Sequence, residues 1–282
     1  MTRCSFVADL HGRLDRYESL LSTIARERPA VVFVGGDLLA HGFARRFDEN
    51  FFGGFLHPRL AELRARLGEA YPRVLVILGN DDPAIEVREL EKLAADGLLE
   101  HVHMRRAELA GFDVYGYACV PPTPFLLKDW ERWDVSRYLD PGCVSPEEGH
   151  RSVPADPSSV RYGTIARDLA ALAGTAGLDR AVMLFHAPPH ETNLDRAALD
   201  GRMVDHVPLD PHVGSIAIRR FIEERQPLVT LHGHVHESAR LTGSWRDRIG
   251  RTHLFSAAHD GPELALVRFD LEDPASAKRE LL

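Results

Sequence analysis

Side chains that could bind a metal ion gather at the end of one apolar segment of the chain. "LHGHVHES" (231–238) places His232, His234 and His236 within five positions after an apolar run. This spacing fits a metal-binding strand end and equally a histidine-rich surface turn, and by itself it does not separate the two. So short a cluster cannot complete a metal site of any complexity. Further ligands must come from other parts of the chain.

Four other apolar segments end in residues of the same kinds. They supply Asp9 and His11 in "ADLHG", Asp37 in "GGD", Asn80 and Asp81 in "GND", and His186 in "FHAP". If these segments are parallel strands, their carboxyl ends lie along one edge of a sheet, where ligand crevices form. That edge would bring residues that are distant in sequence close together.

The types of these side chains indicate which metals they could bind. Carboxylate or amide oxygens combined with imidazole nitrogens suit Mn, Fe, Co or Zn rather than a Ca or Mg site. The set is larger than one tetrahedral zinc ion needs. Asp37, in the middle of the order, could bridge two ions about 3.5–4 Å apart, a spacing used in phosphate hydrolysis. Asp9 could instead cap the following helix, and Asn80 could simply be a turn residue. Neither role explains why the other predicted strands also end in residues that can bind a metal.

The elements that would position these residues alternate between strands and helices. Apolar, β-branched runs predict strands at 4–9, 30–37, 73–80, 112–118, 181–188, 227–234, 252–258 and 263–271. Apolar residues at helical spacing predict helices at 14–28, 58–70 and 215–225. The early strands are apolar almost throughout, which is typical of strands covered on both faces. The sequence therefore predicts an α/β protein.

Two later segments depart from this alternation. The last two predicted strands have only "HDGP" between them, which predicts a hairpin and hence an antiparallel addition near the C-terminal end. Residues 121–160 are rich in Pro, Ser and Asp and contain Trp130 and Trp133. We expect this stretch to be an ordered loop inserted into a single domain spanning 1–282. The tryptophans could form part of a lid, or they could only anchor the loop.

The composition excludes several classes of protein. The chain has 282 residues, is 44% hydrophobic and carries a formal net charge of −8, which argues against extended nucleic-acid binding. Its apolar runs are shorter than the roughly 18–20 residues of a membrane-spanning helix. The N-terminal residues read directly into a strand rather than a signal peptide. The three cysteines form no CxxC pair, which suits a reducing compartment. We therefore expect a cytoplasmic protein, and the sequence carries no signal for an oligomeric state.

In chain order, "DLH", "GGD", "GND", a lone His and "GHVH" resemble the motifs of the metallophosphoesterase (calcineurin-like phosphoesterase) superfamily. The resemblance implies a sandwich of two mixed β-sheets flanked by helices, with a dinuclear metal centre at the strand ends. It further implies hydrolysis of a small-molecule phosphoester with two divalent ions, Mn, Fe or Zn. Carried over by position, the ligands are Asp9, His11 and His236 for one ion, Asn80, His186 and His234 for the other, and Asp37 as the bridge.

One residue departs from the family pattern. Asp81 stands where the family usually has a histidine that is thought to stabilise the transition state or protonate the leaving oxygen. An aspartate, with an ordinary pKa of about 3.9, is ionised at neutral pH, and nearby dications would lower its pKa further. As an anion it would repel a doubly charged substrate, so we expect phosphodiesters to be preferred over alkyl monoesters. His190 and His206 are candidates to replace the missing proton donor, although a lone histidine is often structural or exposed.

Other interpretations remain open at this stage. His232 has no ligand role in the family, which favours an ordinary buried histidine or one that orients a ligand. His259, in the turn "AAHDGP", has no assigned role. A non-catalytic scaffold or ligand-binding module on the same fold is the main alternative to an enzyme, and the retention of all seven ligands counts against it. An amidohydrolase or a metallo-β-lactamase would place its histidine motif earlier or with a following Asp-His pair.

Overall fold

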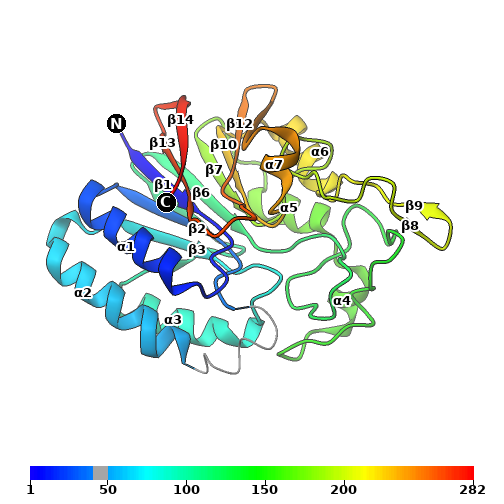
Figure 1. The fold of residues 1–282 in the computed structure, drawn as a ribbon, viewed down its shortest axis with the longest axis horizontal. Helices are drawn as coiled ribbons and strands as arrows, with labels where there is room; N and C mark the ends of the chain where they lie inside the picture. The colour runs from blue at the N-terminus through cyan, green and yellow to red at the C-terminus, as the bar shows by residue number, and fades with distance from the viewer. Residues whose placement is uncertain (41–49) are drawn as a thin grey trace.

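The computed structural model describes residues 1–40 and 50–282 of the chain. They form two six-stranded β-sheets with helices outside each sheet, and a small hairpin of β8 (Met203–Val204) and β9 (Val207–Pro208) extends away from both (Figure 1). The sheets pack against each other, as the Phe255 and Phe269 rings show with centroids 5.5 Å apart. The predicted sandwich of two mixed sheets flanked by helices is confirmed.

The first sheet has the strand order β14-β13-β1-β2-β3-β4. Its strands are β1 (Arg3–Val7), β2 (Val31–Gly35), β3 (Arg73–Ile77), β4 (Glu100–His101), β13 (Ala265–Asp270) and β14 (Asp273–Leu281). Strands β1 to β4 are parallel, and β13 pairs antiparallel with both β1 and β14. Every residue of β2 is buried, in agreement with its continuously apolar sequence and with cover on both faces.

The second sheet has the order β11-β12-β10-β7-β6-β5. Its strands are β5 (Arg106–Leu109), β6 (Phe112–Tyr117), β7 (Ala181–Phe185), β10 (Val229–His232), β11 (Arg246–Ile249) and β12 (Thr252–Ser256). The four central strands are parallel, while β5 and β11 are antiparallel edge strands. In both sheets the parallel strands therefore have carboxyl ends from which loops can converge on one site.

Helices cover the outer faces of both sheets (Figure 1). The helices of the described residues are α1 (Leu14–Glu27), α2 (His57–Leu67), α3 (Val87–Ala95), α4 (Pro157–Tyr162), α5 (Ile165–Ala173), α6 (Ile216–Arg225) and α7 (Ser238–Thr242), with shorter helical turns at Phe51–Leu56, Gly68–Ala70 and Ala84–Glu86. Of these, α4 lies among the loops of the irregular segment rather than on a sheet (Figure 1). The three predicted helices all form. The α6 helix begins where the Ser215 hydroxyl accepts a hydrogen bond from the Ile218 backbone N–H at 3.0 Å.

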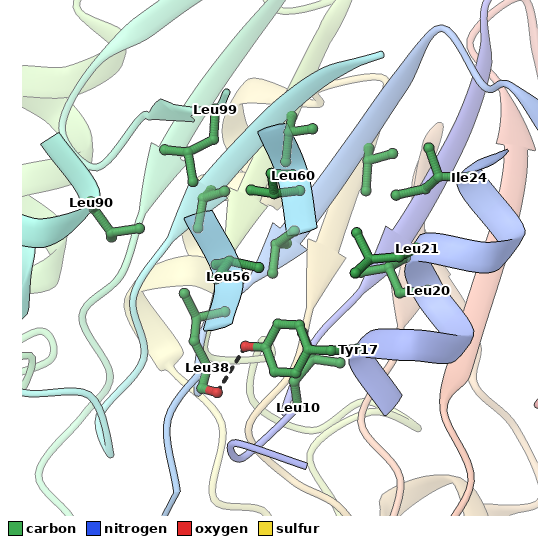
Figure 2. Close-up of a pocket in the computed structure, with 14 residues that line it drawn as sticks. Leu10, Tyr17, Leu20, Leu21, Ile24, Leu38, Leu56, Leu60, Leu90 and Leu99 are labelled. Carbon is green, nitrogen blue, oxygen red and sulfur yellow. Dashed lines mark hydrogen bonds between the residues drawn. The ribbon is translucent and has the colours of Figure 1, made fainter. Parts of the chain in front are cut away.

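A small cavity of about 30 Å³ lies between α1, α2, α3 and the first sheet (Figure 2). It is lined by apolar side chains such as Leu20, Leu60 and Leu99, together with Tyr17. The Tyr17 hydroxyl donates to the Leu38 carbonyl at 2.8 Å. A cavity of this kind offers a water molecule too few polar partners, so it is a packing defect of the core rather than a polar binding site.

The predicted hairpin of the last two strands is wrong. β12 pairs with β10 and β11 in the second sheet, whereas β13 lies between β1 and β14 in the first. The segment containing "HDGP" therefore crosses from one sheet to the other. Both strands are largely buried, so their apolar sequences suit either sheet and do not specify a partner. β12 instead pairs antiparallel with β11, and β13 pairs antiparallel with β1 and β14.

The irregular segment 121–160 packs against the turn that follows β3. The Trp130 indole donates to the Asp82 carbonyl at 2.7 Å, and the Trp133 side chain is also buried. Lys128 and Glu131 form a fully buried ion pair with the Lys Nζ 2.5 Å from the Glu Oε2. Trp130 thus anchors this segment to the turn after β3, while the Trp133 carbonyl accepts a hydrogen bond from the Ile165 N–H at the start of α5 at 2.8 Å.

Candidate metal centre

Seven predicted ligands converge where parallel strands of both sheets end. Asp9 and His11 follow β1, Asp37 follows β2, Asn80 follows β3, His186 follows β7, and His234 and His236 follow β10. Among them, the aspartates and histidines fall into two groups whose potential ligand atoms lie within 4.8 Å of one another. The structure therefore brings together residues that are up to 227 positions apart, from Asp9 to His236.

The first group consists of Asp9, His11, Asp37 and His236. The Nε2 atoms of His11 and His236 are 3.0 Å apart, and the His236 Nε2 lies 3.5 Å from the Asp9 Oδ1. The Asp37 Oδ2 is 4.0 Å from the His11 Nε2. Two imidazole nitrogens and two carboxylates thus face a common point, and a cation there would bind the lone pairs of both rings.

The second group consists of Asp37, His186 and His234. The His186 Nε2 lies 3.3 Å from the Asp37 Oδ2 and 3.1 Å from the Asn80 Oδ1, which adds an amide oxygen to this group. Asp37 belongs to both groups and so lies between them. Each group also combines loops from the first sheet with loops from the second.

The loops that carry the candidate ligands have an unusual backbone. Asp9, His11, Asp37 and His234 have φ angles of 56°, 47°, 52° and 73°. A non-glycine residue in this left-handed region costs on the order of 1–3 kcal/mol and is found where the surrounding structure imposes it. Gly233 is needed because a Cβ there would lie 2.7 Å from the Asp9 Oδ2. The fold therefore holds these candidate ligand residues in strained backbone conformations, at a local cost in free energy.

Burial lowers the pKa of His234 to about 3, whereas for His186 and His236 the neighbouring carboxylates outweigh burial and raise the pKa. Burial opposes protonation of His186, but the Asp37 carboxylate outweighs it and raises the His186 pKa to about 10. Burial favours protonated Asp37, but the His186 and His11 charges outweigh it and lower the Asp37 pKa. The His186 Nδ1 is 2.7 Å from the Gly35 carbonyl, which leaves its Nε2 facing Asp37. Buried carboxylates that attract protons to metal-competent nitrogens are suited to exchange those protons for cations.

Two buried residues support the ligand loops and were not singled out from the sequence. The fully buried Asp82 carboxylate accepts hydrogen bonds from the backbone N–H groups of Leu38, Leu39 and Gly79 at 2.9–3.0 Å. Burial and the Asp37 charge raise the Asp82 pKa to about 7, against the effect of these N–H donors. Asp82 thus connects the loop after β2 to the turn after β3. Its signal in the sequence is the second aspartate of "GNDD".

Arg16 supports the loop after β1 in a similar way. Its guanidinium donates to the carbonyls of Asp9 at 2.5 Å, Gly261 at 2.6 Å and Pro262 at 3.4 Å. Only 6% of Arg16 is exposed. Arg16 lies on the buried face of α1, four positions before Leu20, which marks it as unusual for a charged residue but does not specify its partners.

His232 lies beside the site but points elsewhere. It is fully buried, with Nδ1 2.9 Å from the Ala187 carbonyl and Nε2 2.7 Å from the Thr230 hydroxyl. Burial lowers its pKa to about 3, so the ring is neutral. Since both ring nitrogens are engaged by neighbouring groups, His232 fits the structural interpretation.

The other histidines considered as functional lie outside the two ligand groups. The His190 Nε2 is 3.3 Å from the Asp210 Oδ2. His206 is exposed in the turn between β8 and β9, which extends from the body of the molecule (Figure 1). The His259 Nε2 is 3.0 Å from the Glu263 Oε2. By contrast, Asp81 lies at the site.

Comparisons with known proteins agree with this geometry. The family described as calcineurin-like phosphoesterase matches residues 3–238, and the chain belongs to this family. It is a hydrolase, and the family acts on phosphoesters with divalent metal ions. No curated protein matches the chain. Within residues 1–40 and 50–282, no helix is both long enough and apolar enough to span a bilayer.

Solved structures show the same fold at low sequence identity. One aligns over 99% of this chain and 98% of its own, with a TM-score of 0.60 and 20% identity. The protein TT1561 of Thermus thermophilus aligns over 99% and 98%, with a TM-score of 0.56 and 15% identity. A dimetal phosphatase from Danio rerio aligns over 94% and 91%, with a TM-score of 0.51 and 14% identity. At these identities the likeness concerns the fold alone.

Proposed function

We propose that the chain is a dinuclear metal-dependent phosphodiesterase that acts on small-molecule substrates. The observation that carries this proposal is the pair of ligand groups that share Asp37. One ion would be held by Asp9, His11 and His236, the other by Asn80, His186 and His234, with Asp37 as the bridge. The mixture of oxygen and nitrogen ligands suits Mn, Fe or Zn.

Divalent ions bound here would supply Lewis-acid activation of water and of the phosphoryl oxygens. The protein's own groups prepare the ligands for this role. The Gly35 carbonyl accepts a hydrogen bond from the His186 Nδ1–H, which directs Nε2 toward the site. The Arg16 guanidinium fixes the carbonyl of Asp9.

The preference for diesters is based on Asp81. Its side chain is 14% exposed, and its Oδ2 lies 3.8 Å from the His11 Nδ1, so its negative charge borders the first ligand group. A phosphomonoester dianion carries one more negative charge than a diester. If the substrate's phosphoryl group bound about 7 Å from this carboxylate, repulsion between two unit charges would be about 0.6–2.4 kcal/mol for dielectric constants of about 80–20, or roughly threefold to fiftyfold in rate.

The test is a paired assay of an aryl phosphodiester and an aryl phosphomonoester after addition of Mn, Zn or Fe. We expect a higher kcat/KM for the diester with the wild-type protein, and a shift toward the monoester with Asp81→His. Asp37→Asn should abolish turnover, whereas Asp96→Asn, which removes a carboxylate paired with His57 outside the site, should not.

Three outcomes would contradict parts of the proposal. A wild-type preference for the monoester would refute the role given to Asp81 in selectivity. Unchanged turnover in Asp37→Asn would refute the bridging assignment. A purified protein with no bound metal and no turnover after metal addition would favour the non-catalytic scaffold or ligand-binding alternative.

A further inference from the structure

Residue 81 contacts candidate ligands of both groups. Its backbone N–H donates to the Asp37 Oδ1 at 2.9 Å. Its side-chain Oδ1 accepts a hydrogen bond from the Asn80 Nδ2 at 3.2 Å, and its Oδ2 lies 3.8 Å from the His11 Nδ1. One residue thus reaches the proposed bridge and one proposed ligand of each ion.

On the His11 side, the geometry places a carboxylate behind a ligating imidazole. The His11 Nε2 faces the first group, 3.0 Å from the His236 Nε2. Its Nδ1 therefore points away from that group and toward the Asp81 Oδ2. At 3.8 Å the two atoms are too far apart for a hydrogen bond, so the carboxylate acts on His11 through its charge, which favours the tautomer with a proton on Nδ1 and makes the ligand more basic.

On the Asn80 side, the same carboxylate determines which end of an amide faces the site. The Asn80 Oδ1 lies 3.1 Å from the His186 Nε2, within the second group. Its Nδ2 donates to the Asp81 Oδ1. Since an amide has an acceptor at one end and only donors at the other, an acceptor at Nδ2 keeps the oxygen directed at the metal position.

We propose that Asp81 is a positioning residue that holds His11 and Asn80, one ligand of each ion, in their ligating orientations. This role rests on the proposed dinuclear site and differs from that of a proton donor. It requires two acceptor oxygens on one side chain. A histidine at this position would offer at most one acceptor nitrogen, so it could not make both contacts. The substitution of Asp for the family histidine therefore changes how the ligands are supported.

The two oxygens can be separated by substitution. Asp81→Ala removes both acceptors. Asp81→Asn keeps one oxygen, which can accept from Asn80, while its NH₂ faces the His11 N–H and repels it. We therefore expect Asp81→Asn to weaken the ion bound by His11, and Asp81→Ala to weaken both ions, each by about 10- to 100-fold.

The experiment is a calorimetric titration of Mn²⁺ into chelator-treated protein, which reports the affinity and number of ions independently of activity. Co²⁺ absorption spectra of the same variants report the coordination of each ion, which a general loss of stability would not change selectively. Asp96→Asn serves as the matched control, because its carboxylate also pairs with a histidine, His57, at 2.7 Å. It should bind Mn²⁺ like the wild type.

The outcomes distinguish this inference from the function on which it rests. Fewer than two Mn²⁺ ions bound by the wild type would overturn the dinuclear site and the role of Asp81 with it. Two ions in the wild type and unchanged affinities in Asp81→Ala would overturn the positioning role alone. If the near-isosteric Asp81→Asn weakened the binding of both ions equally, the assignment of Oδ1 to Asn80 and of Oδ2 to His11 would be overturned.

Discussion

Replacement of Arg16 by Met should destabilise the protein and loosen the loop that carries Asp9. The two short hydrogen bonds to the Asp9 and Gly261 carbonyls are lost, while the bulk of the side chain is largely kept. Hydrogen bonds from a charged donor contribute about 1.5–3 kcal/mol each, and relief from burying the guanidinium offsets part of the loss. We therefore expect the free energy of unfolding to fall by about 2–4 kcal/mol.

The assay is guanidinium chloride unfolding of the chelator-treated protein, followed by circular dichroism. Arg13→Met is the matched control, because Arg13 is only partly buried on the same part of the chain and its side chain pairs only with Asp15 among the contacts described. The control should unfold at the wild-type denaturant concentration. Because the Asp9 φ of 56° depends on its surroundings, Arg16→Met should also weaken Mn²⁺ binding. Identical unfolding midpoints for the two variants would refute this reasoning.

Three further outcomes are expected. Asp82→Ala leaves three buried N–H groups unpaired at about 1–3 kcal/mol each, or about 3–9 kcal/mol together, and relief from burying the carboxylate offsets part of this loss. Denaturant unfolding should therefore show a loss of about 3–5 kcal/mol, and a loss below 1 kcal/mol would contradict the role of Asp82. The His186 pKa is raised, so its stabilising effect in metal-free protein is complete below about pH 6.5 and disappears as the pH passes about 10. Mn²⁺ binding near pH 8 should therefore release a proton, detectable by calorimetry in buffers of different ionisation enthalpy, and no release would contradict the assignment of His186 as a ligand. Trp130→Phe removes the hydrogen bond to the Asp82 carbonyl and should lower the free energy of unfolding by about 0.5–1.5 kcal/mol, whereas unchanged stability would argue against this anchor.

The parallel strands and the positions of the candidate ligands could be predicted because each carries a local signal. β2, for example, is a short, fully buried apolar strand that is followed directly by glycine and Asp37. The convergence of the strand ends then follows from the rule for parallel sheets. The helices α1 and α6 likewise have one apolar side that can be read from the spacing of Leu, Ile and Phe.

The edge strands and the supporting contacts could not be predicted, because they depend on tertiary neighbours. β14 is mostly polar and exposed, since it lies at the edge of the first sheet. β12 and β13 are adjacent in sequence but enter different sheets, a choice that their similar burial does not encode. The contact between Arg16 and the carbonyls of Gly261 and Pro262 joins residues 245–246 positions apart, so no local pattern specifies it.

Because each ligand group takes residues from both sheets, bound ions would act as cross-links between the two halves of the sandwich. His236 from the second sheet meets Asp9 from the first, and His186 from the second meets Asp37 from the first. Ion binding of this kind favours the aligned arrangement by about 2.7 kcal/mol per site when the free ion is at 100 times its dissociation constant. With both ions bound, the chemistry at the strand ends and the packing of the two sheets would be linked, and a mutation that shifts one sheet relative to the other would be expected to weaken metal binding as well as stability.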